Sequence, residues 1–377
     1  MEYRTSVLSS LADVAPADWD RLTEGNPFLS HAFLHALHES ASACAETGWQ
    51  PQFLAVWDGN SLAAAMPLYV KSHSYGEYVF DWAWAEAYHR NGIEYYPKLL
   101  SAIPFTPVTG PRLMARDSTA RAALLQFLSE QQSVAGMSST HILYPPEDEA
   151  RQLAQAGFML RSGVQFHWLN QGYESFEQFL QTLEQKKRKN IRAERRKVRD
   201  AGVTLRQVRG SEATEADWRF FHRCYGNTYA EHRSSPYLNL DFWLRLARTM
   251  PQHLLLVMAE IDGRPVAASL VVHTADTLYG RYWGAMEHIP CLHYEAAYYQ
   301  PLEFCIANGI KTFEGGAQGE HKMARGFLPQ KTWSAHWLAR HDFADAVERF
   351  LAREAGGIDD YLDELNEHNP FRQQAGL

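Results

Sequence analysis

An internal repeat constrains the fold of this chain more than any other feature. The segment "NPFLSHAFLHAL" at 26–37 resembles "SPYLNLDFWLRL" at 235–246, with proline, leucine and phenylalanine in equivalent places. The segment "WDGNSLAAAMPLYV" at 57–70 matches "IDGRPVAASLVVHT" at 261–274, so both pairs lie 204 to 209 residues apart. Self-similarity at one period indicates a repeated structural unit. The 377-residue chain is therefore predicted to hold two copies of one domain.

Each copy contains the signal of a β-hairpin. Asp58-Gly59 follows an apolar run at 53–57, and Asp262-Gly263 follows another at 254–261. Asp-Gly between apolar runs favours a two-residue turn, because glycine readily adopts positive φ. A second strand is expected after each turn.

The segments after the hairpins extend the pattern. "SYGEY" at 74–78 and "LYGRY" at 278–282 are predicted to be aromatic strands, and the tyrosine-rich segments at 95–100 and 294–310 to be helices. The second helix leads into the strand "KTFEGG". The first copy ends with a helix at "RAALLQFLSEQQ", a strand at "HILYPP" and a helix at "EDEARQLAQAGF". Hairpin, helix and strand in this order indicate a mixed α/β sheet flanked by helices.

Composition excludes several classes of protein. A hydrophobic content of 46% can form a sizeable core. The sequence has no run of about 18 apolar residues and no signal-peptide pattern at its start, so we expect no membrane span and a cytoplasmic location. The cysteines lack metal-ligand spacing, which predicts neither a metal site nor a disulfide framework. They are Cys44, Cys224, Cys291 and Cys305.

A strongly basic segment interrupts an otherwise acidic chain. Residues 186–199 carry nine Lys or Arg and one acid, although the net charge of the chain is -8. Ser175 and Gln178 before it have capping-box spacing, so one long helix is predicted over 176–200. A solvated helix face is one interpretation. The other is a site for a polyanion, bound by phosphate contacts. The candidates for that site are Lys187, Lys189, Arg192, Arg195 and Arg196.

The segment "FEGGAQGEHKMARGF" at 313–327 gathers glycines and charges after a predicted strand. A surface loop is one interpretation, but convergent charge beside bare backbone favours a site. Acyl transfer to an amine needs a proton acceptor and donors for an oxyanion. Glu314 or His321 could accept the proton, and Lys322 could balance the oxyanion. Substrate contacts are expected from Gly315, Gly316 and Arg325.

Aromatic segments supply further candidates. In "YGEYVFDWAWAEAYHR" the aromatic residues either pack in the core or form a substrate wall. In the second case Asp81 lies among Trp82, Trp84 and Tyr88, and apolar surroundings would raise its pKa so that it accepts a proton. In the second copy, the candidates for a substrate pocket are Tyr282, Trp283 and His293. For His293 a polar role at the helix start is the alternative.

These segments together resemble the GNAT acyltransferase fold, and their tandem arrangement resembles the Fem-type aminoacyltransferases and the wider FemAB-like N-acyltransferases. The basic segment is similar to the Fem pattern of basic residues before an Asn/Leu-Arg-x-Ala and a Gly-Val. "GIKTFEGG" and "KMARGF" are similar to the family's Gly-x-x-x-Tyr-Asp-Phe-Gly-Gly and Phe-Lys-x-Gly-Phe, with Lys322 two places from the family's lysine. The resemblance implies an α/β protein of two tandem GNAT-like domains with mixed, mostly antiparallel sheets flanked by helices. The expected boundaries are 1–170 and 201–345 for the domains, 171–200 for a basic connecting helix and 346–377 for a C-terminal helical tail.

The resemblance also implies an activity. We expect an N-acyltransferase that moves an acyl or aminoacyl group to an amine on a small molecule or a peptidoglycan-type precursor, without a tightly bound cofactor. The donor is aminoacyl-tRNA or acyl-CoA. Neither "AEAYHRNGIEYY" nor "EHIPCLHYEAAYY" has the Gln/Arg-x-x-Gly-x-Gly/Ala pattern of CoA-dependent GNAT proteins, which favours tRNA as donor and partner. The alternatives are an acetyl-CoA-dependent N-acetyltransferase and a non-catalytic module that binds RNA or a cell-wall precursor.

Overall fold

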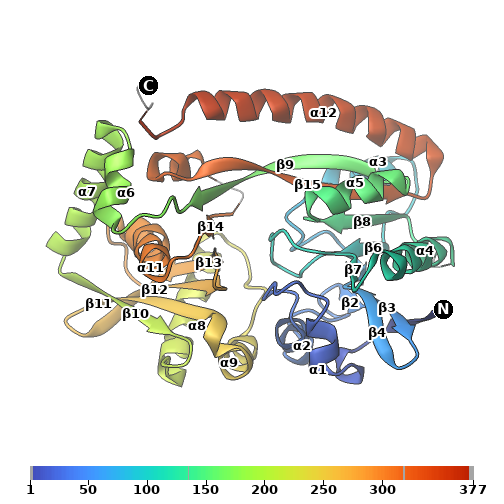
Figure 1. Ribbon diagram of the computed structural model, residues 1–377, viewed down its shortest axis with the longest axis horizontal. Helices are drawn as coiled ribbons and strands as arrows, with labels where there is room; N and C mark the ends of the chain where they lie inside the picture. Colours follow the sequence, from blue (N-terminus) through green and yellow to red (C-terminus); the bar gives the residue numbers. More distant parts are fainter. Residues whose placement is uncertain (1–2, 135, 317–318, 373–377) are drawn as a thin grey trace. The chain divides into compact units, whose positions relative to one another are not determined.

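The computed structural model describes residues 3–134, 136–316 and 319–372 (Figure 1). The chain divides into two compact units. The first comprises Met1–Gly163 and Lys331–Tyr361, and the second comprises Val164–Gln330 and Leu362–Leu377. Both are mixed α/β structures with mostly antiparallel strands and flanking helices, so the predicted fold class is confirmed.

The second unit is built on six strands in the order β10-β11-β12-β13-β14-β9. All neighbours pair antiparallel except β13 and β14, which are parallel. The strands are β10 (Val203–Arg209), β11 (Leu254–Ile261), β12 (Arg264–His273), β13 (Thr277–Ala285), β14 (Thr312–Glu314) and β9 (Met159–Leu169). The turn between β11 and β12 has positive φ at Asp262 and Gly263, as the Asp-Gly signal predicts.

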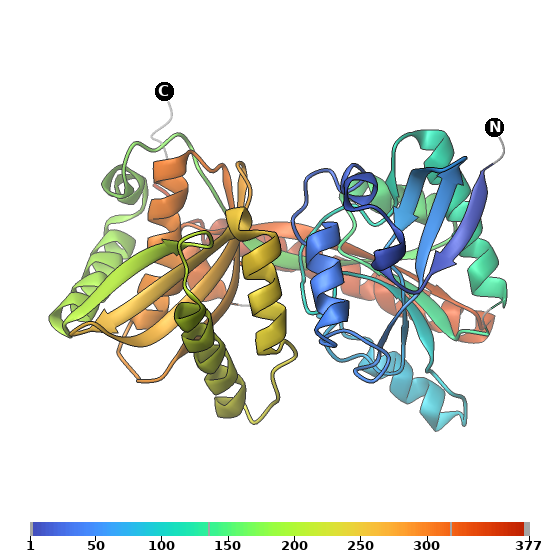
Figure 2. The same ribbon diagram turned by 90° about the horizontal axis from the view of Figure 1, so that it is seen from below.

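Helices cover both faces of this sheet. α8 (Glu215–Glu231) packs on one face, and the helical run of α10 (Leu292–Tyr294), the π-helical segment η3 (Glu295–Tyr299) and α11 (Gln300–Asn308) packs on the other (Figures 1 and 2). Neighbouring residues of β12 and β13 show the two faces, since Gly284 lies against Cys224 of α8 while Ser269 bonds to Ala296 of η3. The unit also contains α6 (Phe176–Thr182), α7 (Gln185–Asp200), α9 (Leu240–Thr249), the 3-10 helix η2 (Pro251–His253) and the 3-10 helix η4 (Glu320–Arg325).

The first unit has its strands in two sheets, with the orders β1-β3-β4-β7 and β15-β8-β6-β5-β2. The strands are β1 (Arg4–Leu8), β2 (Trp49–Pro51), β3 (Phe53–Asp58), β4 (Ser61–Met66), β5 (Tyr69–Lys71), β6 (Lys98–Ser101), β7 (Met114–Ala115), β8 (Ser139–Leu143) and β15 (Leu328–Leu338). Its helices are η1 (Leu11–Asp13), α1 (Pro16–Asp20), α2 (His31–Glu39), α3 (Trp82–Arg90), α4 (Ser118–Val134) and α5 (Glu147–Gln155); α12 (His341–Glu367) follows β15.

Apart from β7, which pairs with β4, the two units share one order of strand pairings. β3 and β4 form the Asp-Gly hairpin that corresponds to β11 and β12, and β6 pairs parallel with β8 as β13 does with β14. The difference is a break: Gln52 separates β2 from β3, and Pro67 lies in the gap between β4 and β5. Proline has no N–H for a sheet ladder, so one sheet becomes two.

Each unit is completed by a strand from the far end of the other copy. β9 follows the first copy in the sequence, but its residues 167–169 pair with β14 of the second unit. β15 follows the second copy, and its residues 334–338 pair with β8 of the first unit. This exchange explains why each unit is made of two separate stretches of chain.

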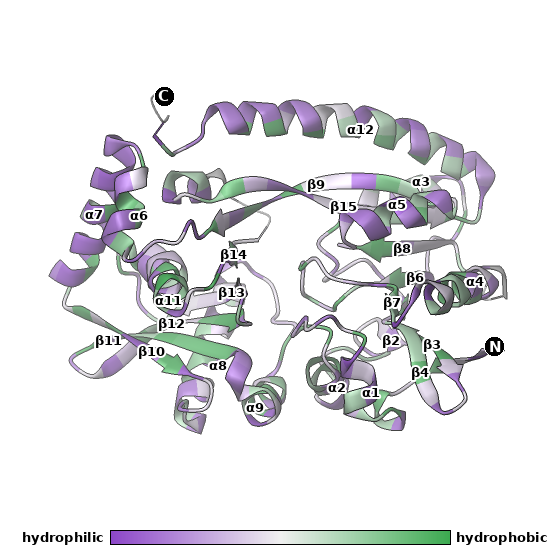
Figure 3. Ribbon diagram, viewed as in Figure 1, coloured by the Kyte–Doolittle hydropathy of each residue, from purple (hydrophilic) through white to green (hydrophobic). Residues whose placement is uncertain are grey.

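Three local predictions were wrong. Residues 74–78 are not a strand but a turn region before α3. Residues 95–100 do not form a helix; the strand β6 begins at Lys98, because Pro97 disfavours helical conformation before it and Leu99 is buried in the core. The helix expected over 176–200 is broken into α6 and α7 at Leu183, which is extended, fully buried and bridged to Phe371. Hydrophilic residues then dominate α7 (Figure 3).

Candidate active site

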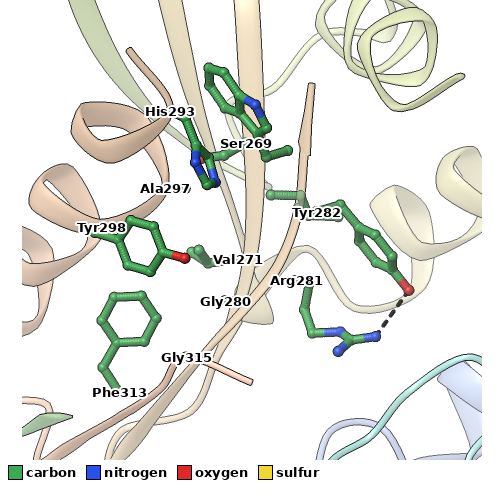
Figure 4. Close-up of a pocket in the computed structure, with 12 residues that line it drawn as sticks. Ser269, Val271, Gly280, Arg281, Tyr282, His293, Ala297, Tyr298, Phe313 and Gly315 are labelled. Atoms are coloured by element: carbon green, nitrogen blue, oxygen red, sulfur yellow. Dashed lines mark hydrogen bonds between the residues drawn. The ribbon is translucent and has the colours of Figure 1, made fainter. Parts of the chain in front are cut away.

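A gap in the sheet of the second unit opens where β13 and β14 separate. The two strands pair only from Thr277 with Thr312 to Tyr279 with Glu314. β14 then ends, whereas β13 continues to Ala285. A cavity of about 110 Å³ lies beside the gap (Figure 4). It is lined by Ser269, Leu270, Val271, Gly280, Arg281, Tyr282, Trp283, His293, Ala297, Tyr298, Phe313 and Gly315.

A β-bulge aims polar side chains at this cavity. Leu270 pairs with Tyr282 but Val271 pairs with Gly280, so Arg281 is the extra residue. Bulges re-aim side chains and are common next to active sites. Arg281 Nη2 donates to the Tyr282 hydroxyl at 3.2 Å (Figure 4). The bulge therefore places a guanidinium at the cavity wall.

Two glycines keep the gap narrow but open. A Cβ on Gly280 would lie 3.0 Å from the ring of Phe313. A Cβ on Gly315 would lie 2.9 Å from the ring of Phe327 and 3.0 Å from the Phe166 carbonyl oxygen. Both contacts are tighter than side chains normally allow, so these positions need glycine.

The helical run supplies the opposite wall. His293, Ala297 and Tyr298 line the cavity, and the Tyr298 hydroxyl points into it (Figure 4). The π-helical segment lies within this run, and such segments are frequent at functional sites. Burial lowers the pKa of His293 to about 4, assisted by the nearby His321 and Arg325. The imidazole of His293 is therefore neutral at pH 7.

Glu314 and Lys322 of the Gly-rich segment are buried titratable groups. Glu314 Oε2 is buried without a hydrogen-bond partner, and burial raises the pKa of Glu314 to about 8 although the Arg281 guanidinium opposes the shift. The Lys322 side chain is also buried, its Nζ donates to the Gly316 carbonyl at 3.3 Å, and burial lowers its pKa to about 8. Groups that titrate near neutral pH suit proton transfer.

The other candidates of this segment have different surroundings. Arg325 Nη2 donates to both carboxylate oxygens of Glu194, each at 2.9 Å, and its guanidinium lies 3.6 Å from the ring centre of Tyr294. His321 is exposed, with Nε2 3.5 Å from the Tyr298 hydroxyl. Neither residue lines the cavity.

The structure thus brings together part of the expected site. Four candidates line the cavity: Tyr282, Trp283, His293 and Gly315. Five lie near it in the chain or through contacts but do not line it: Glu314, Gly316, His321, Lys322 and Arg325. The sequence analysis missed Arg281 and Tyr298. The tyrosine-rich helix was a signal for Tyr298, whereas the sequence contains no signal for the bulge at Arg281.

The basic helix forms one side of a second feature, an open groove of about 740 Å³ between α6 and α7. The five polyanion candidates differ in their partners. Arg195 binds Glu295 at 2.9 and 3.0 Å and Glu303 at 2.7 Å, and Arg192 pairs with Glu177. Within the described part of the chain, the remaining three have no ion pair: Lys187, Lys189 and Arg196. Arg192 and Arg195 are therefore paired with carboxylates of the protein, whereas the other three cations are left for solvent or a ligand.

Asp81 lies in the first unit, in surroundings that differ from the prediction. It accepts hydrogen bonds from Lys98 Nζ at 2.5 Å and from the Tyr95 hydroxyl at 2.6 Å. Burial by itself would raise the pKa of Asp81, but the Lys98 ammonium and His141 hold the pKa below its ordinary value. The expected raised pKa is wrong, because an ammonium rather than indoles faces the carboxylate.

The aromatic residues near Asp81 in the sequence differ in burial. Trp84 and Tyr88 are buried in a hydrophobic cluster with Val347 and Leu351, so they belong to the core of the first unit. Trp82 is 41% exposed and contacts Tyr75. The interpretation as core packing therefore holds for two of the three aromatic residues.

No group of three or more His, Cys, Asp or Glu in residues 3–134, 136–316 and 319–372 could hold a metal ion. None of the helices in those ranges combines the length and apolar character needed to cross a membrane.

Comparison with known proteins places the chain in a family. Its sequence matches the FemAB-like family, described as peptidoglycan biosynthesis/recognition, over residues 10–373. The crystal structure of FemX has a TM-score of 0.57 at 11% identity and covers 92% of this chain and 100% of its own. L-PGS from Bacillus licheniformis has a TM-score of 0.55 at 9% identity, covering 91% and 97%.

A tandem GNAT protein from the clavulanic acid biosynthesis pathway has a TM-score of 0.45 at 13% identity and covers 90% of this chain and 99% of its own. No curated protein sequence matches significantly. The structural likenesses concern the fold, whereas the family match spans nearly the whole sequence. This chain belongs to the FemAB-like family.

Proposed function

We propose that the protein transfers an acyl or aminoacyl group to an amine, with the reacting carbonyl in the cavity beside the β13–β14 gap. The observation that carries the proposal is the combination of this cavity with the Arg281 guanidinium, the Tyr298 hydroxyl and the buried, unbonded Glu314 Oε2. The description of the FemAB-like family supports a peptidoglycan-type precursor as the acceptor.

The chemistry needs three contributions from the protein. The amine nitrogen attacks the carbonyl carbon, a C–N bond forms, and the bond to the leaving atom of the donor breaks while that atom takes a proton. Arg281 and Tyr298 can stabilise the negative charge that develops on the carbonyl oxygen. Glu314 or Lys322 can take or supply a proton near neutral pH, because each has a pKa of about 8. Glu314 is our preferred proton acceptor, since its two neighbours in the sequence, Phe313 and Gly315, both line the cavity.

The donor must extend beyond the cavity. A volume of about 110 Å³ accommodates an acyl group but not a whole coenzyme or nucleotide. The segment before α10 includes Pro290, which has no N–H, and therefore lacks the run of free amides that would hold a pyrophosphate. Phosphates can instead meet the unpaired cations of the α6–α7 groove, Lys189 and Arg196. We therefore favour an aminoacyl-tRNA donor over acyl-CoA.

The test is a transfer assay with a peptidoglycan precursor peptide as acceptor and aminoacyl-tRNAs or acetyl-CoA as donors, read by mass spectrometry. Arg281→Met is expected to lower turnover about 100-fold to 1000-fold, as loss of one oxyanion donor does. Arg219→Met, an exposed arginine of α8 outside the cavity, is the matched control. Absence of transfer from every donor would contradict the proposed function. Full activity of Arg281→Met would place the reaction elsewhere.

A further inference from the structure

A second cavity adjoins the first at the end of β13. It measures about 460 Å³ and lies between the C-terminal end of α8, the end of β13 and the segment before α10. Trp283 and His293 line both cavities, so these two side chains form their common wall. A ligand in the larger cavity would therefore lie next to a reacting group in the smaller cavity, beside Trp283 and His293.

The charges that line the larger cavity are of one sign. Glu231 and Glu287 contribute carboxylates, and the described lining contains neither Lys nor Arg. Glu287 already pairs with Arg264. Glu231 is different: it is exposed, and within the described residues its Oε1 accepts one hydrogen bond, from the Asn227 side-chain amide at 3.1 Å. Among the described residues no cation pairs with Glu231, so its carboxylate is open to a ligand.

One side-chain amide links Glu231 to the sheet. The Asn227 side chain that bonds to Glu231 also donates to the carbonyl oxygen of Ala285 at 2.7 Å. Ala285 is the last residue of β13, two residues beyond Trp283 of the common wall. The carboxylate is therefore held near the wall through one amide.

The remaining walls also suit a cation. Trp283 and Tyr294 present aromatic rings, and aromatic faces attract organic cations. The Arg325 guanidinium already lies 3.6 Å from the ring centre of Tyr294, and its charge is balanced by the two oxygens of Glu194. His293 is neutral and has no hydrogen bond from its ring within the described residues, so it can accept an N–H from a ligand.

We propose that the larger cavity binds the acceptor as an organic ammonium ion, with Glu231 as its counter-ion and His293 as the acceptor of one of its N–H bonds. This inference rests on the proposed function, because it assigns the substrate class of the second cavity to the transfer at the first. An anionic donor arm is disfavoured there, since the described lining offers it carboxylates and neither Lys nor Arg.

Binding can be measured without turnover. We expect n-butylammonium to bind the full-length protein in calorimetry at least about five-fold more tightly than n-butanol at equal ionic strength, because the charge supplies the difference. Glu231→Gln should remove that preference. Glu212→Gln, an exposed glutamate outside the cavity, is the matched control and should retain it. Equal binding of the two probes by the wild-type protein would overturn the inference.

The same variant separates the acceptor from the donor, whose aminoacyl group also carries an ammonium. In the transfer assay, Glu231→Gln should raise the KM of the acceptor about ten-fold and leave the KM of the donor unchanged. A raised KM for the donor alone would assign the cavity to the aminoacyl group and overturn the inference. Transfer with an unchanged acceptor KM would also overturn it while the proposed function stands. Preferential ammonium binding without any transfer would support the site and sink the proposed function.

Discussion

Asp81 and Lys98 form a buried ion pair in the first unit, and its removal separates a structural from a catalytic role for Asp81. The Lys98 ammonium is fully buried and donates to Ser74 at 2.8 Å, Glu77 at 2.8 Å and Asp81 at 2.5 Å. The Tyr95 hydroxyl donates to the same oxygen of Asp81. Asp81→Asn keeps the shape of the side chain but removes its charge.

The magnitude follows from what each variant leaves behind. After Asp81→Asn, Lys98 keeps Glu77 and Ser74, so the loss is one charge-assisted hydrogen bond, about 2 to 3 kcal/mol of unfolding free energy. Lys98→Met leaves two buried carboxylates whose closest cation is Lys71, 4.0 Å from Glu77, and we expect a loss of about 3 to 5 kcal/mol. The double variant should lose less than the sum, because only Glu77 and not also Asp81 is then left without the Lys98 ammonium.

The assay is urea denaturation followed by circular dichroism at pH 7, with transfer activity measured per folded molecule. Asp345→Asn, an exposed aspartate of α12 in the first unit, is the control and should change the free energy of unfolding by less than about 0.5 kcal/mol. If Asp81→Asn is as stable as this control, the ion pair does not stabilise the fold. If it loses turnover about 100-fold at unchanged stability, Asp81 is catalytic and the structural assignment is refuted.

Three further predictions concern the second unit. The triple variant Lys187→Glu, Lys189→Glu and Arg196→Glu should lose affinity for tRNA together with most of its salt dependence in filter binding, and unchanged affinity would leave α7 as a solvated helix. Because the pKa of Glu314 is raised to about 8, its basic form is lost as pH falls through 8. The wild-type kcat/KM should therefore drop about ten-fold per unit below pH 8, whereas a pH-independent residual rate is expected for Glu314→Gln; a wild-type profile in that variant would exclude Glu314 as the base. Gly315→Ala should cut turnover at least about ten-fold, because its Cβ would lie 2.9 Å from the Phe327 ring, and a fully active, stable variant would show that the gap is wider than described.

The parts of the fold that depend on local pattern were predictable from the sequence. The repeat and the two Asp-Gly turns led to two copies of one mixed sheet, because turn chemistry and strand alternation act over a few residues. The predictions failed where distant contacts outweigh local preference. Leu183 breaks the long helix because it is buried and bridged to Phe371, a residue 188 positions away in the sequence.

The candidate site, too, could be predicted only where its signal is local in the sequence. The Gly-rich segment and the tyrosine-rich helix identified one wall of the cavity each, since bare backbone and clustered aromatic residues are visible in the sequence. The role of Asp81 could not be judged without its partner, because the direction of its pKa shift depends on Lys98, a neighbour in space rather than in the pattern.

Three features could be predicted from the sequence: the duplicated mixed fold, the basic helix, and the segment that contains Glu314 and Lys322. Three others became visible only in the folded chain: β13 and β14 part after Glu314, a bulge aims Arg281 at the resulting gap, and Trp283 and His293 divide two cavities. The physical reason is that a gap and a bulge are properties of strand register. Register is set by the packing of whole strands against their neighbours, not by the residues at the point where pairing fails.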